Sequence, residues 1–383
     1  MKQFANENHK LIVEKSQELN NLTLGRRSVA QRLELIKLYG SHSLAYATLQ
    51  TDSCGNPLLE YFDTDDGFLA FSTAHCFGTR QIVLGEPICS HDDMEGMLAA
   101  FIKRYPRAVF LQIGEFVGRC LEKLGFLVNR FGTETILDIE SFSLKGLRRQ
   151  DIRTLLNRAH RGCVEVRTLP NVDESPLDVE QVSFEWLQSR VVRSSELRFM
   201  VRPVLHTGEP YVRRLYAFAR EKLVGFAYYD PIFRSGRIVG YHAMTNRFSA
   251  SAPGGTSYLL DVTMAALLKD EGVPHLALGF APFSRVGERE LFRHSWVAKR
   301  SFSFNYSCLN SLYNFRGQDL RKRKFCGRSL PLYFASKGRL LRPFVDLLST
   351  CRVSNFRIGG QILQAVGIHN RVSAELPSTT GVR

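Results

Sequence analysis

Short apolar runs and amphipathic stretches alternate along most of the chain, which is the pattern of a mixed α/β protein. An amphipathic stretch over Val29–Leu38 predicts a helix that stops at Gly40. A second helix, Met94–Ile102, follows two acidic residues, which the helix dipole favours at an N-terminus. A third helix is predicted over 116–124, and strands are predicted over 44–49, 67–72, 81–85, 108–113 and 135–139. We therefore predict one α/β unit over residues 29–144, after an N-terminal lead over residues 1–28.

Residues 145–161 show the clearest amphipathic pattern in the chain. The apolar positions follow the i, i+3, i+4, i+7 spacing of one helix face: Ile152, Leu155, Leu156 and Ala159. The opposite face is basic: Lys145, Arg148, Arg149, Arg153, Arg158 and Arg161. Only Asp151 could pair with these bases within the helix, and Gly162 is a natural stop. We predict a basic linker helix over 145–162 that contacts a polyanion; the alternative is a solvated charged face.

A second unit is predicted over residues 163–336. It contains a helix around 184–190, strands over 222–229 and 236–244, and a glycine-rich turn that opens a helix over 258–269. Strands over 275–280 and 302–306 follow. The order strand, strand, glycine-rich turn, helix, strand is that of the centre of an acetyltransferase-type fold. The remaining tail, 337–383, alternates leucines with arginines and predicts either an interfacial basic helix or a segment packed on the second unit.

Charge is distributed unevenly over the 383 residues, although 44% hydrophobic and 23% charged content is ordinary for a globular protein. Residues 1–140 hold 14 Lys and Arg against 18 Asp and Glu, whereas residues 141–383 hold 37 against 19, a net charge of +18. This asymmetry predicts a surface for nucleic acid or an anionic membrane, with a merely basic protein as the alternative. The start lacks a signal-peptide pattern, and no apolar run approaches the ~18–20 residues of a membrane span, so we predict a cytoplasmic protein.

The eight cysteines are scattered, without C-x-x-C or Cys/His pairing at zinc spacing, so we predict reduced structural thiols and no metal site. G-x-S-x-G and H-E-x-x-H are absent, which leaves hydrolase and metalloprotease functions without support. Glu134, Asp230 and His242 are candidates for proton handling, although a core or turn role is the alternative for His242.

Two further segments could bind phosphate. The turn Gly254-Gly255-Thr256-Ser257 precedes a helix, where unobstructed backbone N–H groups can bind an anion; the alternative is an ordinary capped loop. The four consecutive bases Arg321–Lys324 could neutralise phosphates beside Phe325, or simply be solvated. Arg198 and Arg202, in the basic segment 196–203, are additional candidates for phosphate contact.

Several pieces of the chain, in this order and spacing, resemble the C-terminal synthase domain of bacterial phosphatidylglycerol lysyltransferases, which also exists as stand-alone soluble proteins. The resemblance runs from about Val29 to Ala335. The pieces begin at Tyr39 (YGSHSL), Ile82 (IVLGEPI), Phe131 (FGTETILDI), Leu144 (LKGLRRQDIR), Gly254 (GGTSYLL), Leu278 (LGFAPFS) and Lys322 (KRKF). In the last segment the chain departs from the family pattern, because Gln318-Asp319 replaces Leu-Arg and Arg321 replaces Tyr.

This resemblance implies two tandem acetyltransferase-type (GNAT) domains of α/β (α+β) class, 29–144 and 163–336, joined by the long basic helix. It implies transfer of an aminoacyl group from aminoacyl-tRNA to a hydroxyl of a lipid such as phosphatidylglycerol, without a cofactor. Peripheral contact with an anionic membrane, at the inner face of the plasma membrane, would follow. Phosphate or oxyanion roles carry over to Lys322 and Lys324. A tRNA-binding adaptor without transfer activity and an acyl-CoA-dependent N-acyltransferase remain the alternatives.

The predicted tRNA- and phosphate-binding set consists of Lys145, Arg148, Arg149, Arg153, Arg198, Arg202, Gly254, Gly255, Thr256 and Ser257. The predicted catalytic set consists of Lys322, Lys324, Glu134, Asp230 and His242.

Overall fold

A computed structural model of the protein describes residues 27–75, 78–168, 176–189, 199–205, 208–288, 290–308 and 314–338. Residues 1–26 of the predicted lead, residues 339–383 of the predicted tail and Arg198 lie outside the described residues. No helix in the described part of the chain is long and apolar enough to cross a membrane.

The first half of the chain alternates strands and helices after an N-terminal helix. Its elements are α2 (Val29–Tyr39), η1 (Tyr46–Leu49), β1 (Glu60–Thr64), β2 (Gly67–Ala74), β3 (Arg80–Leu84), α3 (Met94–Arg104), β4 (Val109–Ile113), α4 (Glu115–Lys123) and β5 (Leu127–Asp138). Ser28 and Gln31 form a capping box that starts α2, and Gly40 ends it, as predicted.

The second half also combines helices and strands, with β7, β8 and β9 consecutive. Its elements are η2 (Leu147–Arg149), α5 (Gln150–Arg161), β6 (Val164–Arg167), α6 (Pro176–Gln188), β7 (Arg213–Ala219), β8 (Lys222–Arg234), β9 (Arg237–Phe248), α7 (Thr256–Asp270), β10 (His275–Pro282), α8 (Trp296–Cys308), α9 (Phe315–Lys324) and β11 (Arg328–Ser336). The basic segment is thus a short 3₁₀ turn followed by a helix of 12 residues, α5, rather than one long helix.

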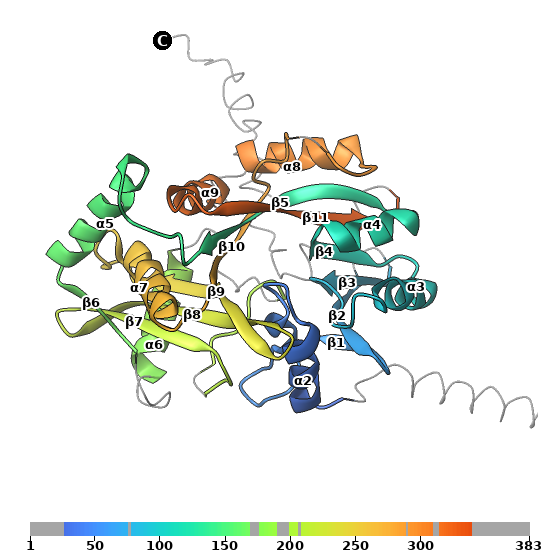
Figure 1. Cartoon of the computed structure of the whole chain (residues 1–383), viewed down its shortest axis with the longest axis horizontal. Helices are drawn as coiled ribbons and strands as arrows, with labels where there is room; N and C mark the ends of the chain where they lie inside the picture. The colour runs from blue at the N-terminus through green and yellow to red at the C-terminus, as the bar shows by residue number, and fades with distance from the viewer. Residues whose placement is uncertain are drawn as a thin grey trace, which may run out of the picture.

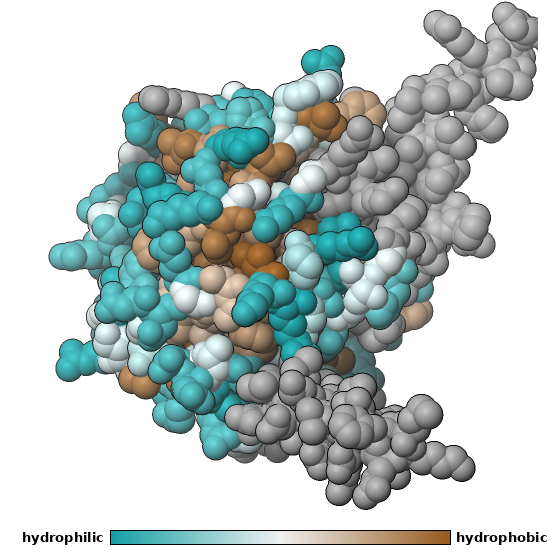
Figure 2. Space-filling model, turned by 90° about the vertical axis from the view of Figure 1, so that its right-hand side faces the viewer, coloured by the Kyte–Doolittle hydropathy of each residue, from teal (hydrophilic) through white to brown (hydrophobic). Residues whose placement is uncertain are grey.

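All described strands join one sheet of 11 strands, in the order β1-β2-β3-β4-β11-β5-β10-β9-β8-β7-β6. Figure 1 shows β1–β4 with α3 and α4 at one end of the molecule and β6–β9 with α5–α7 at the other. The face at the α3 and α4 end carries apolar residues in its middle, with polar residues around them (Figure 2). The fold is therefore of mixed α/β class, built around a large sheet.

The last described strand, β11, lies inside the first half of the sheet. β11 pairs antiparallel with β4 on one side and with β5 on the other. β5 in turn pairs antiparallel with β10 of the second half. Each half therefore supplies a strand to the junction, which fixes residues of β5 beside residues of β10.

β9 and β10 run parallel but pair over only three positions, the last of which joins His242 and Ala277. Beyond that point β10 shifts register against β5, between Ala277 and Phe280. Gly279 sits in this shift at φ +83°, a conformation that favours glycine. The regular pairing of β10 with β9 therefore ends just before Gly279.

Two predicted strands are helical in the structure. Residues 44–49 contain the 3₁₀ turn η1, and every residue from Leu44 to Leu49 is buried, so no alternation of exposed and buried positions marks a strand. Residues 302–306 belong to α8, in which Ala298 and Phe302 are buried one turn apart while Phe304 is exposed. The Phe-Ser-Phe-Asn-Tyr alternation imitates a strand, but burial follows the helical i, i+4 spacing.

Candidate functional site

The candidate site lies where β9 and β10 separate. A Cβ atom placed on Gly279 would be 3.5 Å from His242 Nε2 and 3.7 Å from Lys322 Nζ. His242 comes from β9, and Lys322 comes from α9, which packs on β10. The two side chains, distant in sequence, therefore meet beside the same glycine, and a Cβ atom there would be in van der Waals contact with both.

Glu134 completes this arrangement from β5, where it pairs with Phe280 of β10. The buried Glu134 carboxylate accepts a hydrogen bond of 2.5 Å from Ser43 Oγ at Oε2. Its other oxygen, Oε1, lies 3.6 Å from His242 Nε2. We call Ser43, Glu134, His242 and Lys322 the Glu134 cluster.

Lys322 is buried although it belongs to a run of four bases. Asn314 caps α9 by accepting the Gly317 amide, and the resulting helix turns Asp319 and Lys322 inward. Lys322 Nζ donates a 2.5 Å hydrogen bond to the Phe280 carbonyl. A lysine ammonium without a carboxylate at hydrogen-bond distance is costly to bury, which makes this residue an unusual one for a structural role.

Burial determines the protonation of the cluster. It lowers the pKa of Lys322 to about 7, with Arg321 acting in the same direction and Glu134 opposing. Burial likewise lowers the pKa of His242 to about 3, and the Lys322 charge adds to this, so the imidazole is neutral at pH 7. Burial raises the pKa of Glu134, against the Ser43 hydrogen bond and Lys322. The cluster thus holds an amine able to gain or lose a proton near neutral pH.

A second set of charges lies on the neighbouring strand, where Asp230 of β8 pairs with His242 of β9. Arg202 donates to both Asp230 oxygens, at 2.9 Å from Nε and 2.5 Å from Nη2. Arg202 also bonds Glu209, which Arg214 contacts at 3.3 Å. We call these four residues the Arg202 network. Arg202 is only 3% exposed, so this setting differs from the surface phosphate contact predicted for it. Asp230, predicted to handle protons, has both oxygens engaged by Arg202.

A buried ion pair lies beside α7. Asp261 accepts hydrogen bonds from Arg321, at 2.6 Å, and from the Tyr229 hydroxyl, at 3.0 Å. Tyr229 and Asp230 are adjacent in β8 and therefore point to opposite faces of the sheet. Arg321 and Lys322 are likewise adjacent, and their partners lie on α7 and β10 respectively. Adjacent bases of α9 therefore contact different parts of the structure, Arg321 the helix α7 and Lys322 the strand β10.

Lys324, predicted to be catalytic with Lys322, lies with α5 instead. Its ammonium is 3.2 Å from Asp151, and its carbonyl accepts a 3.3 Å hydrogen bond from Arg149. Residues two positions apart on a helix do not share a face, so Lys324 cannot point where Lys322 points. Arg149 and Arg153 also bind backbone carbonyls, the latter those of Leu144 and Gly146. The exposed bases of this segment are Lys145 and Arg148, which come before α5, and Arg158 and Arg161, in its last turn.

The predicted phosphate turn packs against α5. Gly255 has φ +99°, and a Cβ there would overlap the Leu155 carbonyl. Thr256 is buried and donates to the Pro253 carbonyl at 2.6 Å. The close approach of α5 and α7 thus accounts for Gly255, whereas the space beside Gly254 is open. The phosphate-binding role of residues 254–257 stays a prediction.

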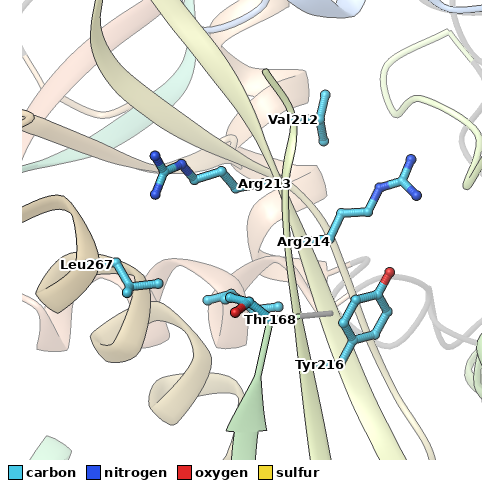
Figure 3. Close-up of a pocket in the computed structure, with 7 residues that line it drawn as sticks. Thr168, Val212, Arg213, Arg214, Tyr216 and Leu267 are labelled. Atoms are coloured by element: carbon cyan, nitrogen blue, oxygen red, sulfur yellow. The ribbon is translucent and has the colours of Figure 1, made fainter. Parts of the chain in front are cut away.

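A surface hollow of about 220 Å³ lies along β7, between Thr168 and Leu267 (Figure 3). Arg213 and Arg214 point to opposite sides of the strand there. Arg213 forms a bidentate pair with Glu271, while Arg214 joins the Arg202 network. The residues of the Glu134 cluster do not line this hollow. Within the described ranges, no group of three or more His, Cys, Asp or Glu side chains could hold a metal ion.

The chain is similar to proteins of a known family over most of its length. The family described as phosphatidylglycerol lysyltransferase, C-terminal, matches residues 33–336. The chain belongs to this family. A phosphatidylglycerol lysyltransferase of Bacillus subtilis is 25% identical over 277 residues, covering 69% of this chain and 30% of that protein. One from Staphylococcus xylosus is 21% identical over 310 residues, covering 78% and 34%. The chain thus spans about a third of the length of these relatives.

Among solved structures, that of L-PGS from Bacillus licheniformis superimposes with a TM-score of 0.65 at 22% identity. The superposition covers 84% of this chain and 94% of the Bacillus licheniformis chain. The family resemblance inferred from the sequence pieces is therefore confirmed, and the fold is shared with this structure.

Sequence reasoning missed Ser43 and the pairing of Arg202 with Asp230. Ser43 lies within the YGSHSL piece, yet a lone serine has no chemical signature until Glu134, 91 positions away, is placed beside it. The segment that carries Arg202 is fixed by Gln50, whose amide donates to the Phe199 carbonyl at 3.1 Å. Contacts of this range depend on the sheet order, which local patterns do not encode.

Proposed function

We propose that this protein transfers an aminoacyl group from aminoacyl-tRNA to a hydroxyl of an anionic membrane lipid such as phosphatidylglycerol. The observation that carries the proposal is the Glu134 cluster, in which a buried lysine with a pKa of about 7 meets a histidine and a carboxylate at the strand separation. Family membership and the curated relatives, named as phosphatidylglycerol lysyltransferases, support the same reaction class.

The reaction needs a proton carrier more than a strong nucleophile, because an aminoacyl ester is already activated. In the proposed mechanism neutral Lys322 takes the proton of the acceptor hydroxyl as that oxygen bonds to the ester carbonyl carbon. The Lys322 ammonium then faces the developing oxyanion and returns the proton to the departing ribose oxygen as the carbon–oxygen bond to tRNA breaks. The Phe280 carbonyl, which accepts from Nζ, holds the amine in place.

The donor surface in this proposal is the exposed side of η2 and α5 with the turn before them. Lys145, Arg148, Arg158 and Arg161 are exposed there, and Arg149 of η2 contacts the end of α9 through the Lys324 carbonyl. Such a surface can neutralise several tRNA phosphates. The α5 backbone also packs directly on the turn at Gly255, the position considered for a coenzyme pyrophosphate, which gives the acyl-CoA alternative less room.

The acceptor surface in this proposal is the outer side of α8 and α9. The exposed residues of α8 include Trp296, Val297, Arg300 and Phe304, and those of α9 are Arg316, Leu320 and Arg323. Trp296 is 71% exposed and Leu320 57% exposed, and exposed large apolar side chains that gather on one side of a protein mark an interaction surface. Apolar and basic residues without acids on one side are typical of contact with an anionic membrane surface. Lys322 projects inward from the same helix, α9.

The decisive experiment incubates the full chain with a mixture of radiolabelled aminoacyl-tRNAs and vesicles that contain phosphatidylglycerol, then separates the lipids. We expect label in a lipid product with the wild type, little with Lys322→Met, and wild-type levels with Lys103→Met, an exposed lysine of α3. Label that stays on tRNA, or passes only to water, would support the adaptor alternative. Inhibition by micromolar coenzyme A would support the acyl-CoA alternative.

A further inference from the structure

The contacts that hold α9 against the rest of the fold bear on how Lys322 is placed, and this inference rests on the proposed function. We propose that Asp319 is a positioning residue for the reaction: through Tyr306 it joins α9 to α8 and thereby keeps Lys322 on the Phe280 carbonyl.

Asp319 and Lys322 lie on the same face of α9. They are three positions apart, a spacing that places two side chains next to each other on a helix, and they are the two buried residues of α9. Leu320, between them in sequence, is exposed instead. The direction in which Lys322 points therefore depends on the rotation of the helix about its axis, and a contact of Asp319 with another element constrains that rotation.

Asp319 makes such a contact with α8. Its Oδ2 accepts a 2.8 Å hydrogen bond from the Tyr306 hydroxyl. Arg323 also pairs with both carboxylate oxygens, at 3.0 Å from Nε and 2.7 Å from Nη2, but it belongs to α9 itself. Within the described residues, the Tyr306 bond is thus the one that joins the Asp319 side chain to another element. α8 and α9 lie next to each other (Figure 1), α8 packed on β5 and α9 on β10.

A second side chain fixes the other side of α9. Arg321, two positions and therefore about 200° around the helix from Asp319, donates to Asp261 of α7 at 2.6 Å. Lys322 follows Arg321 directly, and its Nζ donates to the Phe280 carbonyl. A lysine has a flexible four-carbon stem, so one hydrogen bond does not fix its position unless the helix is held. The contacts to α7 and α8 together supply that restraint.

Loss of the Asp319 contact should be visible in the protonation of Lys322. Titratable and charged groups face this lysine from four elements: Glu134 of β5, His242 of β9, Asp261 of α7 and, on α9 itself, Arg321 and Asp319. Burial is the main reason that the pKa of Lys322 is low, and the Asp319 charge acts in the opposite direction. Removal of that charge alone would therefore lower the pKa further. Release of Lys322 from its buried position would raise the pKa towards its ordinary value of 10.5. The sign of the change separates a positioning role from a purely electrostatic one.

The test measures the pKa of Lys322 in the full chain by competitive labelling with acetic anhydride, which reacts with neutral amines, from pH 5 to 11. Tandem mass spectrometry quantifies the label on Lys322. We expect a pKa of about 7 in the wild type and an increase of about one unit or more in Asp319→Ala. Tyr306→Phe, which removes the bond but keeps the carboxylate, should also raise it.

Transfer should change in parallel with the pKa. We expect the single-turnover rate at pH 7 and saturating aminoacyl-tRNA to fall about tenfold or more in Asp319→Ala, because a catalytic group displaced by about 1 Å can lose much of its rate. The affinity for tRNA should stay unchanged, since the exposed bases of α5 are untouched. Asp270→Ala, which removes an exposed aspartate of α7, is the matched control and should keep both the pKa of Lys322 and the rate.

A fall in the pKa of Lys322 in folded Asp319→Ala would overturn the inference and make Asp319 an electrostatic neighbour. An unchanged pKa would overturn it as well and leave Asp319 a structural residue. Circular dichroism identifies loss of folding, and if Asp319→Ala does not fold, the pKa in Tyr306→Phe decides by the same signs. If the wild type transfers no aminoacyl group, the proposed function fails, whereas the labelling, which needs no substrate, still decides what Asp319 does to Lys322.

Discussion

At the scale of single residues, Lys322 is the group whose protonation should control the reaction. Its pKa of about 7 means that the neutral and charged forms are both populated at physiological pH. Because the neutral form accepts the hydroxyl proton in the proposed mechanism, we expect the single-turnover rate to rise with pH and level off above about pH 7. Rates from pH 5.5 to 8, at saturating aminoacyl-tRNA, measure this directly.

Substitution of Lys322 distinguishes a proton carrier from a fixed positive charge. Arginine keeps the charge but does not deprotonate, so Lys322→Arg should lose about as much rate as Lys322→Met, on the order of 10²- to 10⁴-fold. A wild-type rate that falls above pH 7, together with an active Lys322→Arg variant, would instead indicate that the lysine acts only as a cation towards the oxyanion.

The lowered pKa of Lys322 also means that this residue reduces the free energy of unfolding at low pH. The pKa of Lys322 is about 7 in the folded protein against an ordinary value of 10.5, so between these pH values the unfolded chain binds a proton that the folded chain does not. Stability therefore rises with pH across this window, and the cost is complete below about pH 7. We expect Lys322→Met to be more stable than the wild type at pH 6 in urea unfolding, with the difference shrinking as pH approaches 10. An equal difference at both pH values would contradict this.

The sequence predicted several members of the site without predicting how they meet. Glu134 and His242 were candidates for proton handling and Lys322 for an oxyanion role implied by the family resemblance, and the structure brings the three together near Gly279. Lys324 was grouped with Lys322 because the two are close in sequence, but helix geometry separates their side chains. Asp230 and Arg202 were given separate roles, and only the fold pairs them. The chemistry of a single residue can be read from the sequence, but which residues lie together depends on the pairing of strands from distant segments.

At the scale of elements, the helices and strands with clear local patterns were predicted well, including α2, α3, β4, α4 and α7. The strand β11 was missed because its place depends on partners far away in sequence, β4 and β5, and because Pro331 is unusual in a central strand. Pro331 is tolerated because β11 pairs with β4 only from Tyr333 onwards, so that the proline faces β5 alone. The order of strands was therefore not available from the sequence.

The contact of α5 with α7 gives a test at this scale, with its control one residue away. Gly255→Ala places a Cβ against the Leu155 carbonyl at φ +99°, so we expect a loss of at least about 2 kcal/mol in the free energy of unfolding. Gly254→Ala meets open space and should change stability little. Urea unfolding of both variants measures this, and equal stabilities would show that α5 does not press on the turn.

At the scale of the whole molecule, the proposed reaction needs a tRNA and a membrane to approach one buried cluster. Figure 1 shows α5 at one end of the molecule and α8 on another side, with α9 between them. The end of α9 contacts Arg149 through the Lys324 carbonyl, and Leu320 of α9 is exposed. Lys322, by contrast, is buried on the inner side of α9. In the proposed reaction, the two substrates would therefore bind without competing for the same residues.

We therefore expect the two binding activities to be separable by substitution. Trp296→Ser with Phe304→Ser should weaken binding to vesicles containing phosphatidylglycerol by about tenfold or more, because exposed apolar area available for insertion is lost, and should leave tRNA binding unchanged. Arg158→Gln with Arg161→Gln should weaken tRNA binding and reduce its salt dependence, because phosphate contacts release counterions. Phe116→Ser, an exposed apolar residue of α4, is the control for the first pair. Vesicle sedimentation and tRNA filter binding at several salt concentrations measure both, and loss of vesicle binding in the arginine variant alone would place the membrane against α5 instead.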